Sequence, residues 1–432
     1  MKRLARTLRE QQVQSAKLDT AIADNMESGG VLFNSASKIN EDARQRITKG
    51  IGAPGDVLLS HKGTVGKVSF VAEDAPPFVC SPQTTFWRTL NEEKLDRRYL
   101  YAFLRSRGFH DQLATRAGET DMAPYVSLTS QRGLSLTLPP IATQRAIANI
   151  LGTLDDKIES NRRMNETLEA MARALFKSWF VDFDPVRAKA EGREAALPIE
   201  IANLFPNSFE ESELGEIPKD WVVTVLQEEI TELETGGRPK GGVSEYKAGV
   251  PSIGAESIVG LGIFDYSKTK FVPEEFFQSM TKGQIKSRDV LLYKDGGRPG
   301  EFEPHVTLFG DGFPFDRCAI NEHVYRLRSK ADLGQNFLFF WLSSDLVMEE
   351  MRVKGNGVAI PGLNSTQVRS LTTLAPAKNV ANIFDHFVEP WVSRILMNCN
   401  ESRTLAALRD TLLPKLISGE LRVNDAEKFV AA

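Results

Sequence analysis

Two long stretches of the chain carry apolar residues at every third or fourth position. The first covers residues 143–180, and this spacing places the apolar side chains on one face of an α-helix. At about 1.5 Å per residue, such a helix measures roughly 57 Å. The second stretch, 380–417, repeats the pattern but contains Pro390. Proline removes a helical hydrogen bond, so we expect an interruption there, before a long run that Pro414 and Gly419 end.

Short apolar runs bounded by glycine and proline precede each long stretch. DVLLS at 56–60, GKVSFVA at 66–72 and DVLLY at 289–293 are typical of strands. Residues 94–106 and 335–351 are typical of short helices. These regions are therefore predicted to be mixed α/β.

The chain also contains a large internal repeat. The segment TKG at Thr48, followed five residues later by DVLL, recurs from Thr281 at an offset of 233. At an offset of 238, Cys80 aligns with Cys318 and Arg88 with Arg326, and the two long stretches align at 237. A nearly constant offset predicts a tandem duplication of one unit.

Two equivalent apolar stripes most simply bury each other as an antiparallel coiled coil. The predicted fold is therefore α+β, a tandem repeat of two mixed α/β domains, each followed by a long helix. The expected parts are a first domain at 1–142, a central helix at 143–183, a linker at 184–219, a second domain at 220–377, a C-terminal helix at 378–423 and a tail at 424–432.

The helix–helix seam is predicted from the repeated apolar positions. Its expected members are Leu154, Ile158, Asn161, Leu168, Leu175, Trp391, Ile395, Asn398, Leu405 and Leu412. Asn161 and Asn398 occupy the same position in the two copies. They are either buried seam residues that fix the register or residues at the solvent edge of the stripe, and the sequence leaves both interpretations open.

Composition excludes several classes of protein. The chain of 432 residues is 41% hydrophobic, but it has no apolar run near the ~20 residues that span a bilayer. No secretory signal opens the chain, and three scattered cysteines suit a reducing, cytoplasmic environment. The five histidines form no HExxH pattern. We therefore expect neither a metal centre nor a membrane partner.

The motifs that could carry catalysis stand in the wrong context. Residues 50–55 read GxGxxG but precede a strand instead of opening a helix. Residues 75–78, APPF, lack the side-chain acceptor that amino-methyltransferases place before the two prolines. Asp182-Phe183-Asp184 has no partner residues for a nuclease site, so a helix-end role is favoured. We expect no catalytic residue and no cofactor.

Polar and basic loops lie at equivalent places in the two α/β domains. The most prominent are 60–67 and 293–300, directly after the two DVLL strands. Glycines allow a close approach to phosphate, and basic or amide side chains contact phosphates and base edges. The candidate DNA-binding residues are Lys38, His61, Lys62, Thr64, Lys67, Arg116, Arg238, Lys240, Lys294, Arg298, Lys354 and Asn356.

Three segments carry a resemblance to a known family. LPPIATQRAIA at 138–148, LDDKIE at 154–159 and LLPKLISGEL at 412–421 resemble the helix motifs of specificity subunits of Type I restriction–modification systems. The resemblance implies a non-catalytic DNA reader with two target recognition domains, each reading one half of a split, asymmetric site. It implies long helices that fix the gap between the half-sites. The implied partners are double-stranded DNA, two methyltransferase subunits and motor–endonuclease subunits.

Two features depart from that expectation. The net charge is −4, although residues 1–140 carry 19 Lys and Arg against 15 Asp and Glu, and the acidic excess is greatest in 141–220. The first domain also lacks counterparts of residues 221–233, because Met1 aligns with Glu234. We expect a late start, a truncated N-terminus or a shortened first domain. A self-contained adenine methyltransferase and a coiled-coil adaptor without DNA binding remain the alternatives.

Overall fold

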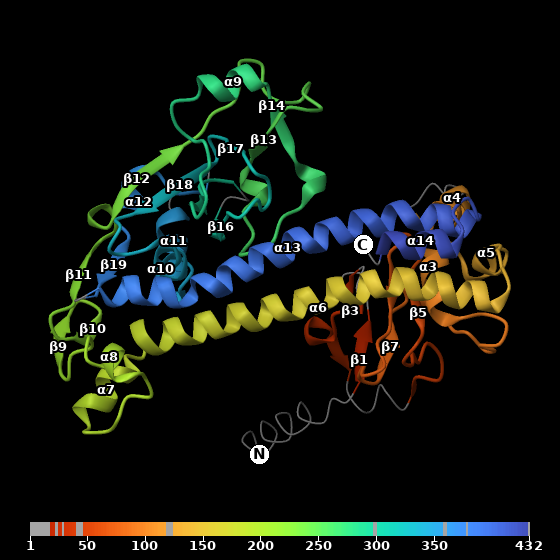
Figure 1. The fold of residues 1–432 in the computed structure, drawn as a ribbon, viewed down its shortest axis with the longest axis horizontal. Coiled ribbons are helices and arrows are strands. Elements are labelled where there is room, and N and C mark those ends of the chain that lie inside the picture. Colours follow the sequence, from red (N-terminus) through yellow and green to blue (C-terminus); the bar gives the residue numbers. More distant parts are fainter. Residues whose placement is uncertain are drawn as a thin grey trace, which may run out of the picture. The chain divides into compact units, whose positions relative to one another are not determined.

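The computed structural model describes residues 18–21, 25–27, 30–39, 46–117, 124–296, 300–356, 361–376 and 379–430. The chain divides into two compact units (Figure 1). Unit 1 comprises Met1–Ser160 and Ser402–Ala432, and unit 2 comprises Asn161–Glu401. Among the described residues, no helix has the length and the apolar run that a membrane crossing needs.

Unit 1 contains two small three-stranded sheets. In the first, β5 (Val57–Ser60) lies between β6 (Val68–Phe70) and β8 (Thr84–Trp87), and both pairings are antiparallel. In the second, β1 (Leu18–Ala21) pairs antiparallel with β4 (Ser37–Ile39) and parallel with β7 (Phe78–Cys80). The remaining short elements are the hairpin β2 (Met26–Glu27) and β3 (Gly30–Val31), and the helices η2 (Phe33–Ser35), α3 (Arg97–Leu104), α4 (Arg107–Ala117), α5 (Leu128–Arg132) and α14 (Val423–Val430).

Unit 2 repeats this plan, and its main sheet has four strands where the described residues of unit 1 show three. The strand order is β12 (Ile230–Thr235), β18 (Val324–Ser329), β15 (Val290–Tyr293) and β16 (Val306–Leu308). The second sheet has β13 (Val250–Ile253) antiparallel to β14 (Lys270–Val272) and parallel to β17 (Ala319–Ile320). The strands β15, β16 and β18 therefore correspond to β5, β6 and β8 of unit 1.

Helices and hairpins complete unit 2. After the repeated sheets come α10 (Gln335–Leu342), α11 (Asp345–Gly355) and α12 (Ser365–Arg369), which correspond to α3, α4 and α5. The remaining elements are the paired strands β11 (Val222–Val225) and β19 (Thr372–Ala375), and the short helices η3 (Leu226–Glu228), η4 (Ala255–Ser257), η5 (Tyr266–Lys268) and α9 (Glu274–Ser279).

The range expected as a linker holds regular structure. It contains α7 (Asp184–Ala190), α8 (Ile199–Ala202) and the hairpin of β9 (Phe209–Ser212) and β10 (Gly215–Pro218). Phe205 of this range is buried against Trp179 with ring centroids 5.1 Å apart. The segment therefore packs into the core of unit 2. Asp184 begins α7.

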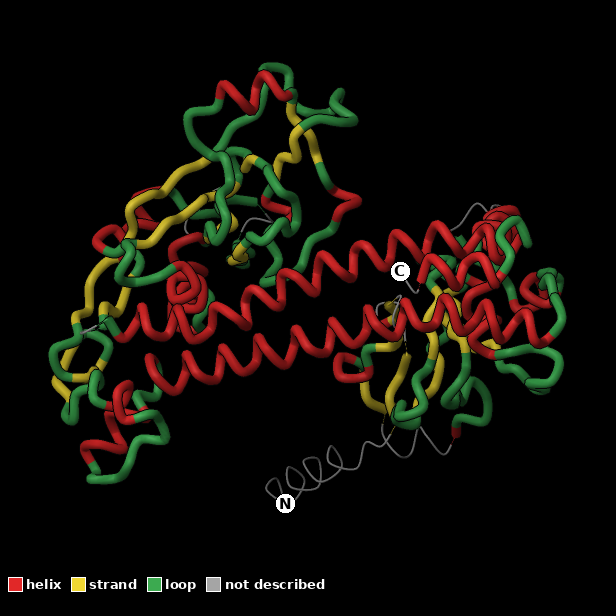
Figure 2. The backbone as a smooth tube through the Cα atoms, viewed as in Figure 1, coloured by secondary structure: helices red, strands yellow, loops and turns green. Residues whose placement is uncertain are grey.

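The two long helices are α6 (Ile141–Phe180) and α13 (Val380–Ser418) (Figure 2). The interruption predicted at Pro390 is wrong, because α13 is continuous through Pro390 and Pro414 and ends before Gly419, whose φ is +77°. A proline inside a helix costs about 3 kcal/mol. Burial of the side chains on either side of Pro390, including Phe384, Val388, Val392 and Ile395, offsets this cost.

The helices run antiparallel within each unit. In unit 2, Asn161 Nδ2 donates to Glu401 Oε2 at 2.8 Å, and Asn165 Nδ2 donates to the Ile395 carbonyl at 3.3 Å. In unit 1, Arg409 Nη1 donates to Asp155 Oδ1 at 2.8 Å. Later residues of α6 thus meet earlier residues of α13. The predicted α+β fold with two mixed α/β domains and paired long helices is confirmed.

The strand registers correct one detail of the predicted repeat. Val57 pairs with Trp87, and its counterpart Val290 pairs with Leu327, which is an offset of 240 for this strand. Similarly, the amide of Cys80 donates to Gly50 O and that of Ile320 donates to Gly283 O, both at 2.8 Å. The alignment at 238 is therefore wrong by two residues. Unit 2 has two more residues than unit 1 between β16 and β17, where the sequence offers no marker of an insertion.

Candidate nucleic-acid interface

In unit 1, the loop that follows β5 is held by backbone hydrogen bonds to two other loops. The amide of Val126 donates to His61 O at 2.9 Å, and that of Gly63 donates to Pro124 O at 3.0 Å. The amide of His61 donates to Gln83 O at 2.9 Å. Residues 60–67 are therefore fixed at the end of the sheet beside 81–84 and 124–126.

The loop after β15 in unit 2 is fixed in the same way. The amide of Leu363 donates to Lys294 O at 2.8 Å, and that of Gly296 donates to Pro361 O at 3.0 Å. The amide of Lys294 donates to His323 O at 3.1 Å. Each unit thus presents the same three-loop scaffold, and Lys62 and Tyr125 of unit 1 occupy the places of Asp295 and Gly362 in unit 2.

The predicted DNA-binding residues of unit 1 fall into two groups. Lys38, Lys62, Thr64 and Lys67 are exposed. His61 is buried, its Nδ1 lies 3.0 Å from Val126 O, and its ring lies 5.5 Å from that of Tyr125. Arg116 donates to Gln112 O and Gly133 O at 3.1 and 2.8 Å. His61 and Arg116 therefore use polar atoms to hold the loops.

The predicted residues of unit 2 divide similarly. Arg238 and Lys240 are exposed and Lys294 is half-buried, while Arg298 lies outside the described residues. Lys354 Nζ donates to Ser370 O at 3.0 Å and pairs with Glu350 at 2.9 Å. Asn356 Oδ1 accepts the amide of Phe302 at 2.7 Å. Lys354 and Asn356 thus stabilise α11 and its neighbours, and their role toward DNA stays a prediction.

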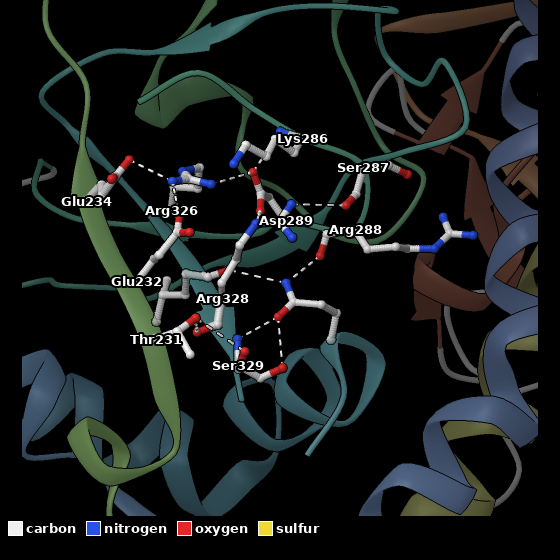
Figure 3. Close-up of polar contacts among 12 residues, drawn as sticks. Thr231, Glu232, Glu234, Lys286, Ser287, Arg288, Asp289, Arg326, Arg328 and Ser329 are labelled. Atoms are coloured by element: carbon white, nitrogen blue, oxygen red, sulfur yellow. Dashed lines mark hydrogen bonds and ion pairs between the residues drawn. The ribbon is translucent and has the colours of Figure 1, made fainter. Parts of the chain in front are cut away.

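A buried ionic network supports the sheet of unit 2 (Figure 3). Arg326 Nη1 donates to Asp289 Oδ2 at 3.1 Å, and its Nη2 donates to Glu234 Oε2 at 2.7 Å and also contacts Glu232. Arg328 pairs with the other oxygen of Asp289 at 2.7 Å. The carboxylates from β12 therefore neutralise an arginine side chain on the adjacent strand.

The charged forms of Asp289 and Arg326 are favoured only while the network is complete. Burial raises the pKa of Asp289, although Arg326 and Arg328 act in the opposite direction. Burial tends to lower the pKa of Arg326, but hydrogen bonds and attraction from Glu234 and Asp289 raise it above the usual value. The internal repeat singled out Arg326 as a match for Arg88, but the sequence did not indicate that Arg326 binds the carboxylates of Glu234 and Asp289.

The described residues of unit 1 contain one part of this network. Arg88 Nε lies 2.7 Å from Asp56 Oδ1, as Arg328 does from Asp289. The corrected register places Phe86 where unit 2 has Arg326. The side chain of Arg88 is 41% exposed, whereas that of Arg326 is 4% exposed. The apolar Phe86 of unit 1 therefore occupies the position of the buried Arg326 of unit 2, whose charge Glu232 and Glu234 neutralise.

The helix seam resolves the two interpretations of its asparagines. Asn161 and Asn398 are both buried, and Asn398 Nδ2 donates to Asn165 Oδ1 at 2.8 Å. Of the other predicted seam residues, Leu154, Ile395 and Leu412 are buried, while Ile158, Leu168, Leu175, Trp391 and Leu405 are half-buried. The asparagines lie within the seam, where a buried amide favours one register.

Unit 1 is expected to lose stability in mild acid. Burial lowers the pKa of His61 from its usual 6.5, and the hydrogen bond with Val126, which raises it, is the weaker effect. The unfolded chain then binds more protons than the folded one, so the free energy of unfolding falls as pH drops below the unfolded value. Urea unfolding at about pH 7.5 and about pH 5.5 should show a smaller fall for His61→Gln than for the native chain. Equal falls would contradict this prediction.

Comparisons with known proteins agree with this arrangement. A family model for the Type I restriction modification DNA specificity domain matches residues 14–170. The chain is 24% identical over 392 residues to the Type I restriction enzyme MjaIX specificity subunit of Methanocaldococcus jannaschii, covering 90% of this chain and 82% of that one. It is 26% identical over 356 residues to the HindI specificity subunit of Haemophilus influenzae, covering 69% and 71%.

A solved structure shares the fold. The crystal structure of a Type I restriction–modification S subunit from M. genitalium matches with a TM-score of 0.50 and 15% identity, covering 93% of this chain and 92% of that one. At this identity the likeness concerns the fold alone. It extends over both units and both long helices.

Proposed function

The chain belongs to the family of Type I restriction–modification specificity subunits, and from this premise we propose that units 1 and 2 each read one half of a split, asymmetric DNA site. A specificity subunit is the DNA-reading, non-catalytic component of its system. The three-loop scaffold, present at the same place in both units, is the observation that carries the proposal.

Different side chains on the same scaffold support two unlike half-sites. Lys62 and Tyr125 in unit 1 stand where unit 2 has Asp295 and Gly362. These positions differ in charge and in size, so the two scaffolds suit different base edges. We expect residues 1–142 and 220–377 to act as the two recognition domains.

The long helices suit a spacer between the half-sites. α6 has 40 residues, which at about 1.5 Å each gives roughly 60 Å. That length corresponds to roughly 18 base pairs at the 3.4 Å spacing of bases along each strand. We propose that α6 and α13 together set the gap in the DNA site.

We propose that the same helices bind methyltransferase subunits. Met164, Met171, Phe387 and Met397 are large apolar side chains exposed on α6 and α13. Met171, with Thr167, Ala170 and Ala174, lines a shallow hollow on α6. Exposed apolar surface of this kind marks protein interaction sites. Motor–endonuclease subunits would then join this core on cytoplasmic DNA.

Met171→Glu is expected to weaken this association about tenfold or more, because a buried charge would replace an apolar contact. The measurement is the affinity of the purified chain for its methyltransferase subunit. Val353→Glu, at an exposed apolar position of α11 in the same unit, is the matched control and should leave the affinity unchanged. Similar losses for the two variants would exclude this face of α6 as the docking site.

The proposed function is tested by co-expression in a host without adenine methylation. The methyltransferase subunit should methylate adenine only when this chain is present, and the S-adenosylmethionine should bind the methyltransferase subunit. Methylation without the chain, or calorimetric binding of S-adenosylmethionine by the isolated chain, would contradict the proposal. The second result would support the alternative of a self-contained methyltransferase.

A further inference from the structure

Five polar side chains gather on the three-loop scaffold of unit 2, and we call them the charged cluster. Arg238 follows β12, Lys294 and Asp295 follow β15, and Glu322 and His323 connect β17 to β18. The guanidinium of Arg238 forms an ion pair with Glu322 through Nη2, and this nitrogen lies 3.3 Å from Nε2 of His323. The loops thus bring Glu322 and His323, which are far from Arg238 in the sequence, into contact with its guanidinium.

The hydrogen bonds in the cluster form a series in which Arg238 donates to His323 and His323 donates to Asp295. Nδ1 of His323 lies 2.5 Å from Oδ1 of Asp295. An ionised carboxylate can only accept, so this contact assigns the proton of a neutral imidazole to Nδ1 and leaves Nε2 as an acceptor. Nε2 can then receive a hydrogen from Arg238. Asp295 therefore orients His323, which in turn orients Arg238.

The backbone beneath Arg238 is also fixed. The amide of Gly236 donates to Asn321 O at 3.2 Å, and the amide of His323 donates to Asn321 Oδ1 at 2.9 Å. A Cβ atom at Gly236 would lie 1.6 Å from Ile320 O, so glycine is required for this close approach. Both the start of the loop and the tip of the arginine side chain are held.

This arrangement suits a base edge better than a phosphate. Two cations, Arg238 and Lys294, face two carboxylates, Asp295 and Glu322, so the cluster has little net attraction for the DNA backbone. Arg238 is nevertheless 49% exposed. Among the described residues, its Nε and Nη1 have no hydrogen-bond partner. Nε and Nη1 point to different sides of the guanidinium and do not form one fork, so Nη1 is left to donate to a single acceptor. This suits guanine, whose major-groove edge offers two acceptors, N7 and O6, and no donor.

We propose that Arg238 reads a guanine in the half-site bound by unit 2, and that Glu322 and His323 are positioning residues that hold its guanidinium. This inference rests on the proposed function and assigns one base to one side chain. Glu322, His323 and Asp295 are not apparent as a site from the sequence, because each lies in a short polar turn between strands.

The test maps methylated motifs for the complete methyltransferase complex carrying Arg238→Ala. We expect one guanine in one half-site to become degenerate, with its preference over other bases falling roughly 10- to 100-fold, while the other half-site stays unchanged. Arg238→Lys keeps the charge and should loosen the same position. His323→Gln retains an acceptor and should preserve more of the guanine preference than His323→Ala. Glu322→Gln should weaken the preference for the same guanine.

The control is Arg317→Ala, which removes another exposed arginine of unit 2, paired with Glu274 of α9. It should leave the motif unchanged. An unaltered motif in Arg238→Ala, or a uniform loss of methylation without a change of base preference in both Arg238 variants, would overturn the assignment. A native motif without guanine in either half-site would also overturn it. The failure of the proposed function is distinct, because the native complex would then show no gapped motif.

Discussion

Arg326→Ala is expected to lower the free energy of unfolding of unit 2 by about 3–5 kcal/mol, the cost of breaking a buried ion pair by removing one partner. The side chain of Arg326 is 4% exposed and that of Asp289 is fully buried. The variant would leave Asp289, Glu232 and Glu234 without their shared cation. Denaturant unfolding followed by tryptophan fluorescence measures the change, since Trp179, Trp221, Trp341 and Trp391 all lie in unit 2.

Arg88→Ala in unit 1 is the matched control for this variant. Arg88 pairs with Asp56 at 2.7 Å, but 41% of its side chain is exposed. Asp56 is itself 1% exposed, but water can reach the vacated site and one carboxylate loses its cation instead of three, so we expect a smaller loss than for Arg326→Ala. Equal losses for Arg88→Ala and Arg326→Ala would show that the carboxylates of β12 do not stabilise unit 2.

Asp155→Ala is expected to destabilise unit 1 by roughly 3 kcal/mol or more. Its two carboxylate oxygens pair with Arg105, the residue directly after α3, and Arg409 of α13, at 2.7 and 2.8 Å. The variant would leave two largely buried guanidinium groups without this carboxylate. Because these contacts join the α/β domain to both long helices, protection of α3 from hydrogen exchange should fall together with that of the helix seam.

The neighbouring Asp156 provides a control one residue away. It pairs with Arg98 at 2.9 Å, but its side chain is 63% exposed, compared with 15% for Asp155. Asp156→Ala should therefore cost well under 1 kcal/mol after allowance for screening. Because Ala favours a helix more than Asp does, a loss as large as that of Asp155→Ala would indicate that burial of the ion pair does not determine the result.

Apolar periodicity was sufficient to predict the long helices and their pairing. The stripe on residues 143–180 corresponds to α6, and the repeat placed its partner correctly on α13. Pro390 could not be assessed from local propensity alone. The buried neighbours Phe384 and Val388 hold α13 intact across it, and only the tertiary structure reveals that contribution.

Sequence identity was less reliable inside the α/β domains. Matching arginines suggested that Arg88 corresponds to Arg326, whereas the strand registers of the two units show that Arg88 is the counterpart of Arg328. The charged cluster was also hidden, since loops separated by more than 80 residues bring Arg238 and His323 together. Loop chemistry of this kind depends on the scaffold, which periodicity does not describe.

The most direct test of the account is a map of methylated adenines for the native complex and for one chimera. In the chimera, the recognition domain at 220–377 is replaced by the matching domain of another family member. We expect a gapped motif of two unlike halves in the native complex, and a change in one half alone, with the gap unchanged, in the chimera. A contiguous palindromic motif, or a change in both halves, would contradict it.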